Sequence, residues 1–464
     1  MYNYVDLFAG CGGLSLGIER SGGKLLLAVE KSDMAAHTFY VNFVDDSFSK
    51  DDWDKFLGRS VNEQVTAGVA VHPLRDVLDD LESMDGLVKQ GIDVVVGGPP
   101  CQGFSLAGRR NPADVRNKLP WEYLEFVQRT RPKIVVIENV VGMSHRFSPD
   151  EESPFVQLQQ ALRDTGDGYI VQGVAVNALH YGAPQNRPRL MILGLRVDVA
   201  EANGFVATEN LWRSAFLDEI DGEVPALAPR PTVTRAQSPT VADAIGDLQT
   251  VFPAHDGPRA TAFRRQLQTR AAWGLPRPSS NSGDIPNQTL RKHSVLTQER
   301  FRLYQWLRTS DISPRVLNRA LTDEQAHDDL ARDLAGSGFP AVSPDGTKIA
   351  DDAAELVKLI DRLHTRKHSQ KALAWDEPAK TVVTLPDDYV HPSEPRILTV
   401  REMARFQGFP DDFVFVGKET TGSLRRRFEV PQYSQVGNAV SPFLASAVGT
   451  MIRHLLGDVA ADAS

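Results

Sequence analysis

The chain has 464 residues, of which 41% are hydrophobic and 24% are charged, and its formal net charge at pH 7 is −9. This length allows two or three domains of ordinary globular composition, and no apolar run is long enough to span a membrane. Because the chain has only two cysteines and a strand-like segment begins at Tyr4, we expect a cytoplasmic protein with no disulfide framework, metal site, membrane anchor or signal peptide.

The first two hundred residues alternate short apolar runs with helix-like stretches. The runs that we interpret as buried strands are 5–8, 24–29, 92–96, 134–137 and 190–195. Helix-like patterns lie between them, for example at 14–20 and 121–130. This alternation predicts an α/β fold with a parallel, doubly wound sheet.

The composition changes near Glu223, where several prolines indicate a linker. Beyond it the strand–helix rhythm is lost until about residue 396, after which two helical patterns complete the chain. We therefore expect a first domain, a second and irregular domain, and a C-terminal segment that returns to complete the first. Their predicted bounds are 1–227, 228–385 and 386–464.

Charge is distributed unevenly over the second domain. Residues 259–308 contain ten Arg or Lys and two acids, whereas residues 323–355 contain nine acids and two basic residues. A local basic face can bind a polyanion even when the whole protein is acidic. Solvated helix faces give the same pattern, so charge alone does not decide between them.

A glycine-rich turn follows the first predicted strand, where residues 6–14 read DLFAGCGGL. Glycines let a ligand approach the main chain closely, although ordinary tight turns use them as freely. Glu30 ends the next strand, where an acid meets ribose hydroxyls. Because residue 15 is Ser15, the dinucleotide pattern is incomplete, and no phosphate-binding Gly-Lys-Ser/Thr occurs. A nucleoside without phosphates, such as S-adenosylmethionine, suits the turn better than NAD or ATP.

Two further predicted strands end in residues that can carry chemistry. The strand at 92–96 is followed by GGPPCQGFS, which includes Cys101, and the strand at 134–137 is followed by Glu138. In a parallel sheet both segments emerge at the carboxyl edge, so a thiol and a carboxyl are expected to share one crevice. A lone cysteine is ordinarily a small buried hydrophobe, but its glycine and proline neighbours here favour a reactive thiol.

A third cluster, residues 185–189, reads QNRPR and precedes the strand at 190–195. Alternation along a strand places the guanidinium groups of Arg187 and Arg189 on one side. They either form structural ion pairs or hold a base oxygen and a phosphate.

Together these segments resemble the bacterial-type DNA (cytosine-5) methyltransferase family. Residues 6–13 are similar to its cofactor loop, 98–105 to its Pro-Cys nucleophile motif and 138–140 to its catalytic Glu-Asn-Val. Residues 185–189 match its Gln-x-Arg-x-Arg motif. Two segments near the C-terminus match its last motifs, at 398–409 and 435–440. The six motifs occur in the family's order.

The resemblance implies a Rossmann-like, S-adenosylmethionine-dependent methyltransferase sheet, with residues 228–385 as a target-recognition domain. It implies that a methyl group passes from S-adenosylmethionine to carbon 5 of a cytosine flipped out of a specific double-stranded DNA sequence. Cys101 would add to carbon 6, and Glu138 would bind ring nitrogen 3 and the exocyclic amine. Arg189 would meet the base carbonyl, with Arg187 supporting the same site.

The resemblance also implies the residues that bind cofactor and DNA. The expected cofactor pocket consists of Phe8, Gly10, Gly12, Glu30, Asp76, Gly98, Pro100, Leu119, Asn438 and Ala439. The expected DNA contacts are Ser105, in a loop that closes over DNA, and the basic residues Arg291, Lys292, Arg366 and Lys367. No metal is implied.

Several alternatives of function and partner stay open at this point. The marked DNA would serve a restriction endonuclease partner, the subunits of another phage-defence system, or an orphan regulatory role. An RNA methyltransferase of the same family is disfavoured by the variable region of nearly 200 residues. A catalytically silent DNA-binding subunit is disfavoured by intact Cys101, Glu138 and Arg189. An NAD-dependent oxidoreductase is disfavoured by Ser15.

Overall fold

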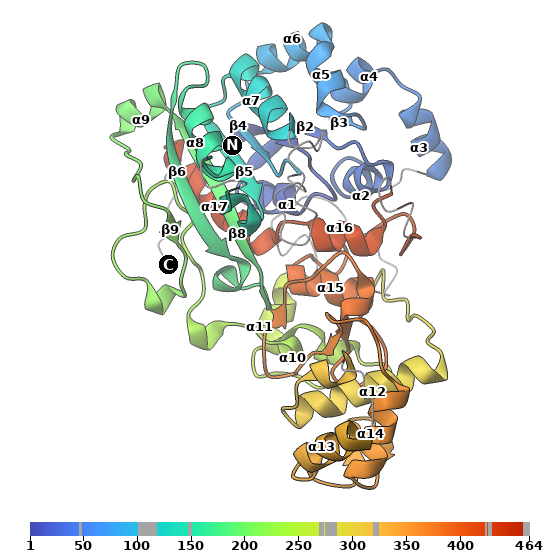
Figure 1. The fold of residues 1–464 in the computed structure, drawn as a ribbon. Coiled ribbons are helices and arrows are strands. Elements are labelled where there is room, and N and C mark those ends of the chain that lie inside the picture. Colours follow the sequence, from blue (N-terminus) through green and yellow to red (C-terminus); the bar gives the residue numbers. More distant parts are fainter. Residues whose placement is uncertain are drawn as a thin grey trace.

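A computed structural model describes residues 1–45, 49–100, 118–146, 151–268, 273, 285–318, 324–422, 425 and 429–457. Figure 1 shows a larger lobe built around a twisted sheet and a smaller, mainly helical lobe below it. Among the described residues, no helix is long and apolar enough to cross a membrane.

A sheet of eight strands in the order β3-β2-β1-β4-β5-β8-β6-β9 forms the centre of the larger lobe. Its strands are β1 (Tyr2–Leu7), β2 (Gly23–Val29), β3 (Val69–Ala70), β4 (Val94–Gly97), β5 (Ile134–Asn139), β6 (Tyr169–Asn177), β8 (Pro188–Arg196) and β9 (Trp212–Arg213). Neighbouring strands are parallel except that β8 is antiparallel to β5 and β6. The predicted α/β class is therefore confirmed.

The orientation of β8 follows from its connection to β6. Only residues 178–187 separate the two strands, and a parallel pair needs a crossover of a dozen or more residues. The chain therefore reverses, and Pro188 of β8 lies opposite Asn177 of β6. This reversal brings the start of β8 beside the end of β5, where Leu190 pairs with Asn139.

Successive residues of the central strands point into two different hydrophobic clusters. Val94 and Val96 belong to one cluster, and Val95 belongs to the other. A continuous buried run of β-branched residues is what a sheet covered on both faces requires. Helices α1 to α3, α9 and α17 contribute to the first cluster, and α4 to α8 contribute to the second.

The helices of the larger lobe are α1 (Gly13–Arg20), α2 (Asp33–Phe43), α3 (Lys50–Leu57), α4 (Val61–Thr66), α5 (Leu74–Asp79), α6 (Leu81–Gln90), α7 (Leu119–Thr130), α8 (Pro154–Arg163), α9 (Val197–Asn203), α16 (Gln432–Asn438) and α17 (Pro442–Leu455). The C-terminal helix α17 packs directly along α1. A Cβ atom added at Gly17 would lie 2.4 Å from the Cβ atom of Ala445, so only glycine allows this approach. The hydroxyl of Ser21 also donates to the Ser446 carbonyl at 3.1 Å.

The smaller lobe has a hydrophobic cluster of its own. This cluster includes Phe301, Trp306, Leu330 and Ile360, and it extends to Ile397. The elements that build it are α12 (Val295–Thr309), α13 (Glu324–Leu334), α14 (Ala353–Arg362), β10 (Ala341–Val342), β11 (Lys348–Ala350), β12 (Lys371–Ala372) and β14 (Tyr389–Val390).

Three helices connect the lobes, namely α10 (Val241–Ile245), α11 (Ala260–Leu267) and α15 (Val400–Gln407). Apolar residues of all three, such as Ile245, Phe263 and Phe406, belong to the first cluster of the larger lobe. The buried guanidinium of Arg405 joins them by binding Asp411, Asp247 and the Ala244 carbonyl. The smaller lobe is thus held by a packed junction, and the domain bounds of 228 and 385 stay a prediction.

A short parallel pairing completes the junction beside the sheet edge. Strand β13 (Ala379–Lys380) pairs with β7 (Gln185–Asn186), immediately before β8 begins. The hydroxyl of Thr381 donates to the Asn186 carbonyl at 2.6 Å. The end of the predicted recognition domain therefore lies against the QNRPR cluster.

Candidate active site

The carboxyl ends of β1, β2, β4 and β5 lie at one edge of the sheet. Leu7, the last residue of β1, pairs with Gly97, the last residue of β4, and Gly97 pairs with Ile137 of β5. Phe8 and Gly98, which follow β1 and β4, and Glu138, which lies near the end of β5, therefore meet at this edge. Open α/β sheets bind ligands at this position.

Glu138 and Arg189 form an ion pair at this edge. Arg189 Nε lies 2.7 Å from Glu138 Oε1, and the two side chains are only 12% and 11% exposed. Burial lowers the pKa of Arg189, and the charge of Glu138 opposes that shift. Arg189 Nη1 also donates to the Pro188 carbonyl at 2.8 Å. A guanidinium has five N–H groups and a carboxylate has two oxygens, so the pair has further donors and acceptors to offer a substrate.

The segment that leads to the predicted nucleophile passes directly beside this pair. A Cβ atom added at Gly98 would lie 3.0 Å from Glu138 Oε2, so glycine keeps the approach open. Asn139 Nδ2 donates to the Pro99 carbonyl at 2.9 Å and fixes the segment to the end of β5. Cys101 and Ser105 themselves lie outside the described residues.

The glycine turn after β1 is organised around Glu30. Glu30 Oε2 accepts from the Gly10 amide at 3.0 Å, and Oε1 accepts from the Ser32 amide at 2.7 Å. Gly10 has a φ of 56°, and a Cβ atom added there would meet nothing within 4 Å. Burial raises the pKa of Glu30. The turn thus presents an open backbone face beside a fixed carboxylate that has lone pairs left.

The motif around Asn438 closes the turn from the opposite side. A Cβ atom added at Gly13 would lie 2.3 Å from the Val440 carbonyl oxygen and 3.3 Å from the Cβ atom of Ala439. Ala439 is buried, whereas Asn438 is exposed at the end of α16. The two predicted pocket residues therefore belong to a segment that packs on the cofactor turn.

Ser15, which breaks the dinucleotide pattern, has a structural partner. Its hydroxyl donates to Asp6 Oδ2 at 2.6 Å, and both side chains are buried. Burial raises the pKa of Asp6 to about 7, the largest influence on this carboxyl. No role for Asp6 was predicted from the sequence, although its position near the end of the first strand could have indicated one.

Arg187 makes different contacts from Arg189. Its guanidinium is buried and donates to the carbonyls of Val382 at 2.9 Å, Gly437 at 2.8 Å and Ala439 at 2.9 Å. Burial lowers its pKa, as does the charge of Arg189. Arg187 therefore joins the QNRPR cluster to two distant segments, and these contacts support a positioning role rather than contact with substrate.

Gln185 also connects these segments, and its contacts were not predicted from the sequence. Its Nε2 donates to Gln407 Oε1 at 2.7 Å, and its Oε1 accepts from the Val382 amide at 3.0 Å. Gln185 and Gln407 lie within matched motifs, but the contacts of Gln185 span 222 and 197 positions of the chain. Only the fold shows that they meet.

The remaining pocket predictions fall in two groups. Phe8, with a φ of 60°, and the half-buried Pro100 and Leu119 are placed beside the ends of β1, β4 and the start of α7. Asp76 is exposed on α5 and lies 3.3 Å from His72 Nδ1. Its predicted contact with adenine stays a prediction.

Among the described residues, no cluster of His, Cys, Asp or Glu is arranged to hold a metal ion.

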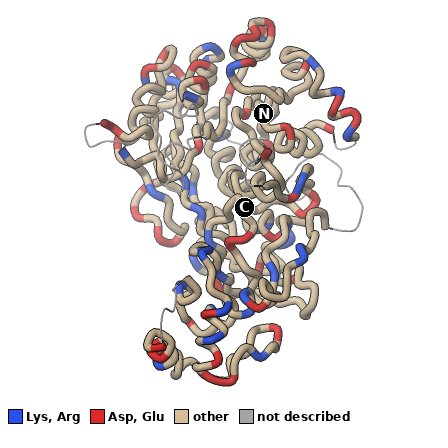
Figure 2. The backbone as a smooth tube through the Cα atoms, turned by 45° about the vertical axis from the view of Figure 1, so that its right-hand side comes forward, with Lys and Arg blue, Asp and Glu red and all other residues tan. Residues whose placement is uncertain are grey.

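Four arginines of the basic stretch at 259–308 form ion pairs with acids from elsewhere in the fold. The ion pairs are Arg259–Asp243, Arg264–Asp247 and Asp256, Arg302–Asp345 and Arg308–Glu377. Figure 2 accordingly shows basic and acidic residues intermingled over the smaller lobe.

The four predicted basic DNA contacts are all exposed. Lys367 pairs with Asp387 at 3.0 Å. Arg291, Lys292 and Arg366 have no ion-pair partner within the described part of the chain.

The doubly wound sheet, the open glycine turn with its carboxylate, and the buried acid–arginine pair define a methyltransferase of the S-adenosylmethionine-dependent class. The sequence model of the C-5 cytosine-specific DNA methylase family matches residues 2–454, so the chain belongs to this family of DNA (cytosine-5) methyltransferases. Family and fold together imply the use of S-adenosylmethionine.

Curated relatives are similar over nearly the whole chain. The type II methyltransferase M.AgeI of Thalassovita gelatinovora is 29% identical, over 97% of this chain and 98% of its own. The type II methyltransferase M.XorII of Xanthomonas oryzae pv. oryzae is 30% identical, over 97% and 84%. A solved structure described as a prophage-encoded DNA modification methyltransferase from E. coli has a TM-score of 0.59, covers 98% of this chain and 100% of that chain, and is 21% identical. It shares the fold.

Proposed function

We propose that the protein methylates carbon 5 of a cytosine in a specific double-stranded DNA sequence, with Cys101 as nucleophile. The observation that carries this proposal is the largely buried Glu138–Arg189 pair, which lies beside the Gly98–Pro100 segment that leads to Cys101. Cytosine offers a carbonyl, a ring nitrogen and an amine along one edge. The pair matches these groups with donors and acceptors.

The chemistry begins with addition of the Cys101 thiolate to carbon 6 of the cytosine. A bond forms between sulfur and carbon 6, and the electron pair of the 5,6 double bond moves toward carbon 5. The carboxyl group of Glu138 donates its proton to ring nitrogen 3 as negative charge develops there and accepts from the exocyclic amine, while Arg189 donates to the base carbonyl. Carbon 5 is methylated, loses its proton to solvent, and the electron pair of that bond expels the thiolate.

The residues at the sheet edge fit S-adenosylmethionine. Glu30 retains lone pairs for ribose hydroxyls, and the backbone at Gly10 is open to a ligand. Phe8, Gly12, Gly98, Pro100, Leu119, Asn438 and Ala439 would complete the pocket, with Asp76 toward the adenine. When bound, this cofactor supplies an electrophilic methyl group.

The target base lies inside the duplex stack, so we infer that it is flipped out at a cost of a few kcal/mol. A second lobe that grips the flanking DNA would offset this cost, and we assign this role to the smaller lobe, which lies below the sheet lobe in Figure 1. We assign backbone contacts to Arg291 and Lys292, sequence contacts to Arg366 and Lys367, and loop contact to Ser105. Double-stranded DNA is thus the partner.

The type II relatives support a role in marking self-DNA within a restriction–modification system. A cognate restriction endonuclease is then a partner, and acting on host DNA would place the protein in the cytoplasm. Another phage-defence system or an orphan mark would use the same chemistry.

A single methyl-transfer assay tests this proposal. The full chain is incubated with S-adenosylmethionine carrying a CD3 group and with unmethylated genomic DNA or total transfer RNA, and nucleosides are analysed by mass spectrometry. We expect trideuterated 5-methyldeoxycytidine from DNA and no label in RNA. Label only in RNA, or at the exocyclic amine of cytosine, would refute the proposal. Bisulfite sequencing of the product DNA then identifies the target sequence.

A further inference from the structure

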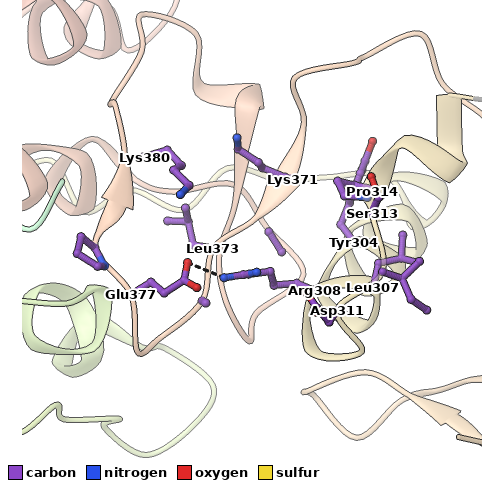
Figure 3. A pocket seen from close by; sticks show the side chains of 14 residues that line it. Tyr304, Leu307, Arg308, Asp311, Ser313, Pro314, Lys371, Leu373, Glu377 and Lys380 are labelled. Atoms are coloured by element: carbon purple, nitrogen blue, oxygen red, sulfur yellow. Dashed lines mark ion pairs between the residues drawn. The ribbon is translucent and has the colours of Figure 1, made fainter. Parts of the chain in front are cut away.

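A cavity of about 400 Å³ lies in the smaller lobe, close to the junction with the larger one. One wall is the end of α12 and the 3-10 turn η8 (Pro314–Asn318), and the other is the segment from β12 to β13. Figure 3 shows the side chains of Lys371 and Lys380 on one side of the cavity and Tyr304 and Leu307 on the other.

The lining carries more positive than negative charge. Arg308 forms an ion pair with Glu377 at 2.6 Å, which leaves Asp311 against Lys371 and Lys380. Within the described residues, no carboxylate lies at ion-pair distance from either lysine. The ammonium of Lys371 instead lies 5.9 Å from the centre of the Tyr389 ring.

The two lysines are close enough to influence each other. Burial lowers the pKa of Lys371, as does the neighbouring charge of Lys380, whereas the charge of Asp388 opposes this shift and that of Arg308 adds to it. Two like charges beside one cavity are unfavourable, and an anion between them would reduce that cost.

The cavity is directly connected to the active site through the backbone. Lys380 pairs with Asn186, and the Val382 carbonyl accepts from Arg187. Three residues beyond Asn186, Arg189 reaches Glu138. A ligand on Lys380 is therefore fixed in register with the residues that would hold the cytosine.

We propose that this cavity receives one sugar–phosphate unit of the DNA backbone, with its phosphate between Lys371 and Lys380. This inference rests on the proposed function, since it takes DNA as the bound partner. Lysine binds phosphate as a point charge, and apolar lining residues such as Leu307, Pro314 and Leu373 suit the deoxyribose. Such a contact fixes the position of the DNA without reading its sequence.

A salt titration of DNA binding tests the proposal. The full chain binds a labelled duplex of random sequence between 50 and 200 mM salt, roughly the range over which phosphate contacts dominate affinity. The double substitution Lys371→Gln with Lys380→Gln should lower the slope of log affinity against log salt by about 0.9, the value for one phosphate. We expect the slope to fall by the same amount for a DNA duplex of any sequence. An unchanged slope would overturn the proposal.

Three variants keep the result interpretable. Lys358→Gln removes an exposed lysine of α14 that does not line the cavity, and its slope should equal that of the native chain. Lys371→Arg with Lys380→Arg retains both charges and should restore the slope. If Lys371→Gln prevents folding, the exposed Lys380→Gln alone should still lower the slope. Failure of that variant to do so would count against the proposal.

Two further arms separate other outcomes. Calorimetry with inorganic phosphate should show no saturable binding at millimolar concentration. Phosphate binding that the double variant loses, together with an unchanged slope for DNA, would make the cavity a site for free phosphate and overturn the proposal.

Methyl transfer by the native chain is measured in parallel. If it labels DNA while the slopes do not differ, this inference fails and the proposed function stands. If it labels no DNA, the proposed function fails.

Discussion

Glu138→Gln should lower kcat by about 10²–10³-fold while leaving the affinity for DNA nearly unchanged. The carboxyl group donates a proton to ring nitrogen 3, where negative charge develops only during addition, so its loss affects the transition state more than binding. The amide can still contact the exocyclic amine of the base. Single-turnover methylation and DNA titration on the same variant separate the two effects.

The same substitution has a structural consequence that must be measured beside it. Glu138 Oε1 lies 2.7 Å from Arg189 Nε with both side chains largely buried, and breaking a buried pair costs about 3–5 kcal/mol when one charge is left alone. Glutamine keeps an acceptor for Arg189, so we expect a smaller loss and a folded protein. Glu125→Gln, on α7 with Arg75 as its partner, is the matched control and should keep kcat. A loss of affinity with unchanged turnover would make Glu138 a docking residue.

Cys101→Ser should abolish methyl transfer, a loss of roughly 10³-fold or more, and should spare cofactor binding. A serine hydroxyl forms far less of the nucleophilic anion at neutral pH than a thiol does. Turnover is measured as methyl incorporation, and cofactor binding is measured by calorimetry with S-adenosylmethionine. Substantial turnover by the serine variant would contradict the assignment of the nucleophile.

The other cysteine provides the control for this experiment. Cys11 is buried, its Sγ lies 3.6 Å from the Gln435 carbonyl, and burial raises its pKa to about 12. It is therefore a neutral thiol at pH 7 and not a nucleophile. Cys11→Ala should keep most of the activity, with a modest loss of stability from the small cavity it leaves. Loss of activity in both variants would point to misfolding rather than chemistry.

The sequence predicted the parts of the fold that depend on local pattern. The runs at 92–96 and 134–137 became β4 and β5 because a buried parallel strand needs a continuous apolar segment. β6 was not predicted, since Gln172 and Gly173 interrupt its apolar pattern. Gln172 is fully buried and donates to the Asn210 carbonyl. The hydrogen bond of the buried Gln172 side chain depends on a tertiary contact, which no local sequence pattern predicts.

The same distinction between local pattern and tertiary contact applies to the active site. Glu138 and Gly98 follow predicted strands, so their place at one edge could be inferred from topology. The burial of Arg187 on carbonyls of Val382 and Gly437 could not, because those partners lie far along the chain. The basic stretch at 259–308 likewise gave no sign of the acids that pair with four of its arginines, such as Asp345.

The central claim is that Cys101 bonds to a cytosine that is methylated at carbon 5. DNA synthesised with 5-fluorodeoxycytidine in place of deoxycytidine tests it most directly, because every target site then carries fluorine at carbon 5. Fluorine cannot leave as a cation, so the thiolate is not expelled after methylation. We predict a covalent complex that forms only with S-adenosylmethionine and in which mass spectrometry locates the modified base on Cys101. The absence of a complex, a bond to another residue, or equal yield without the cofactor would contradict the account.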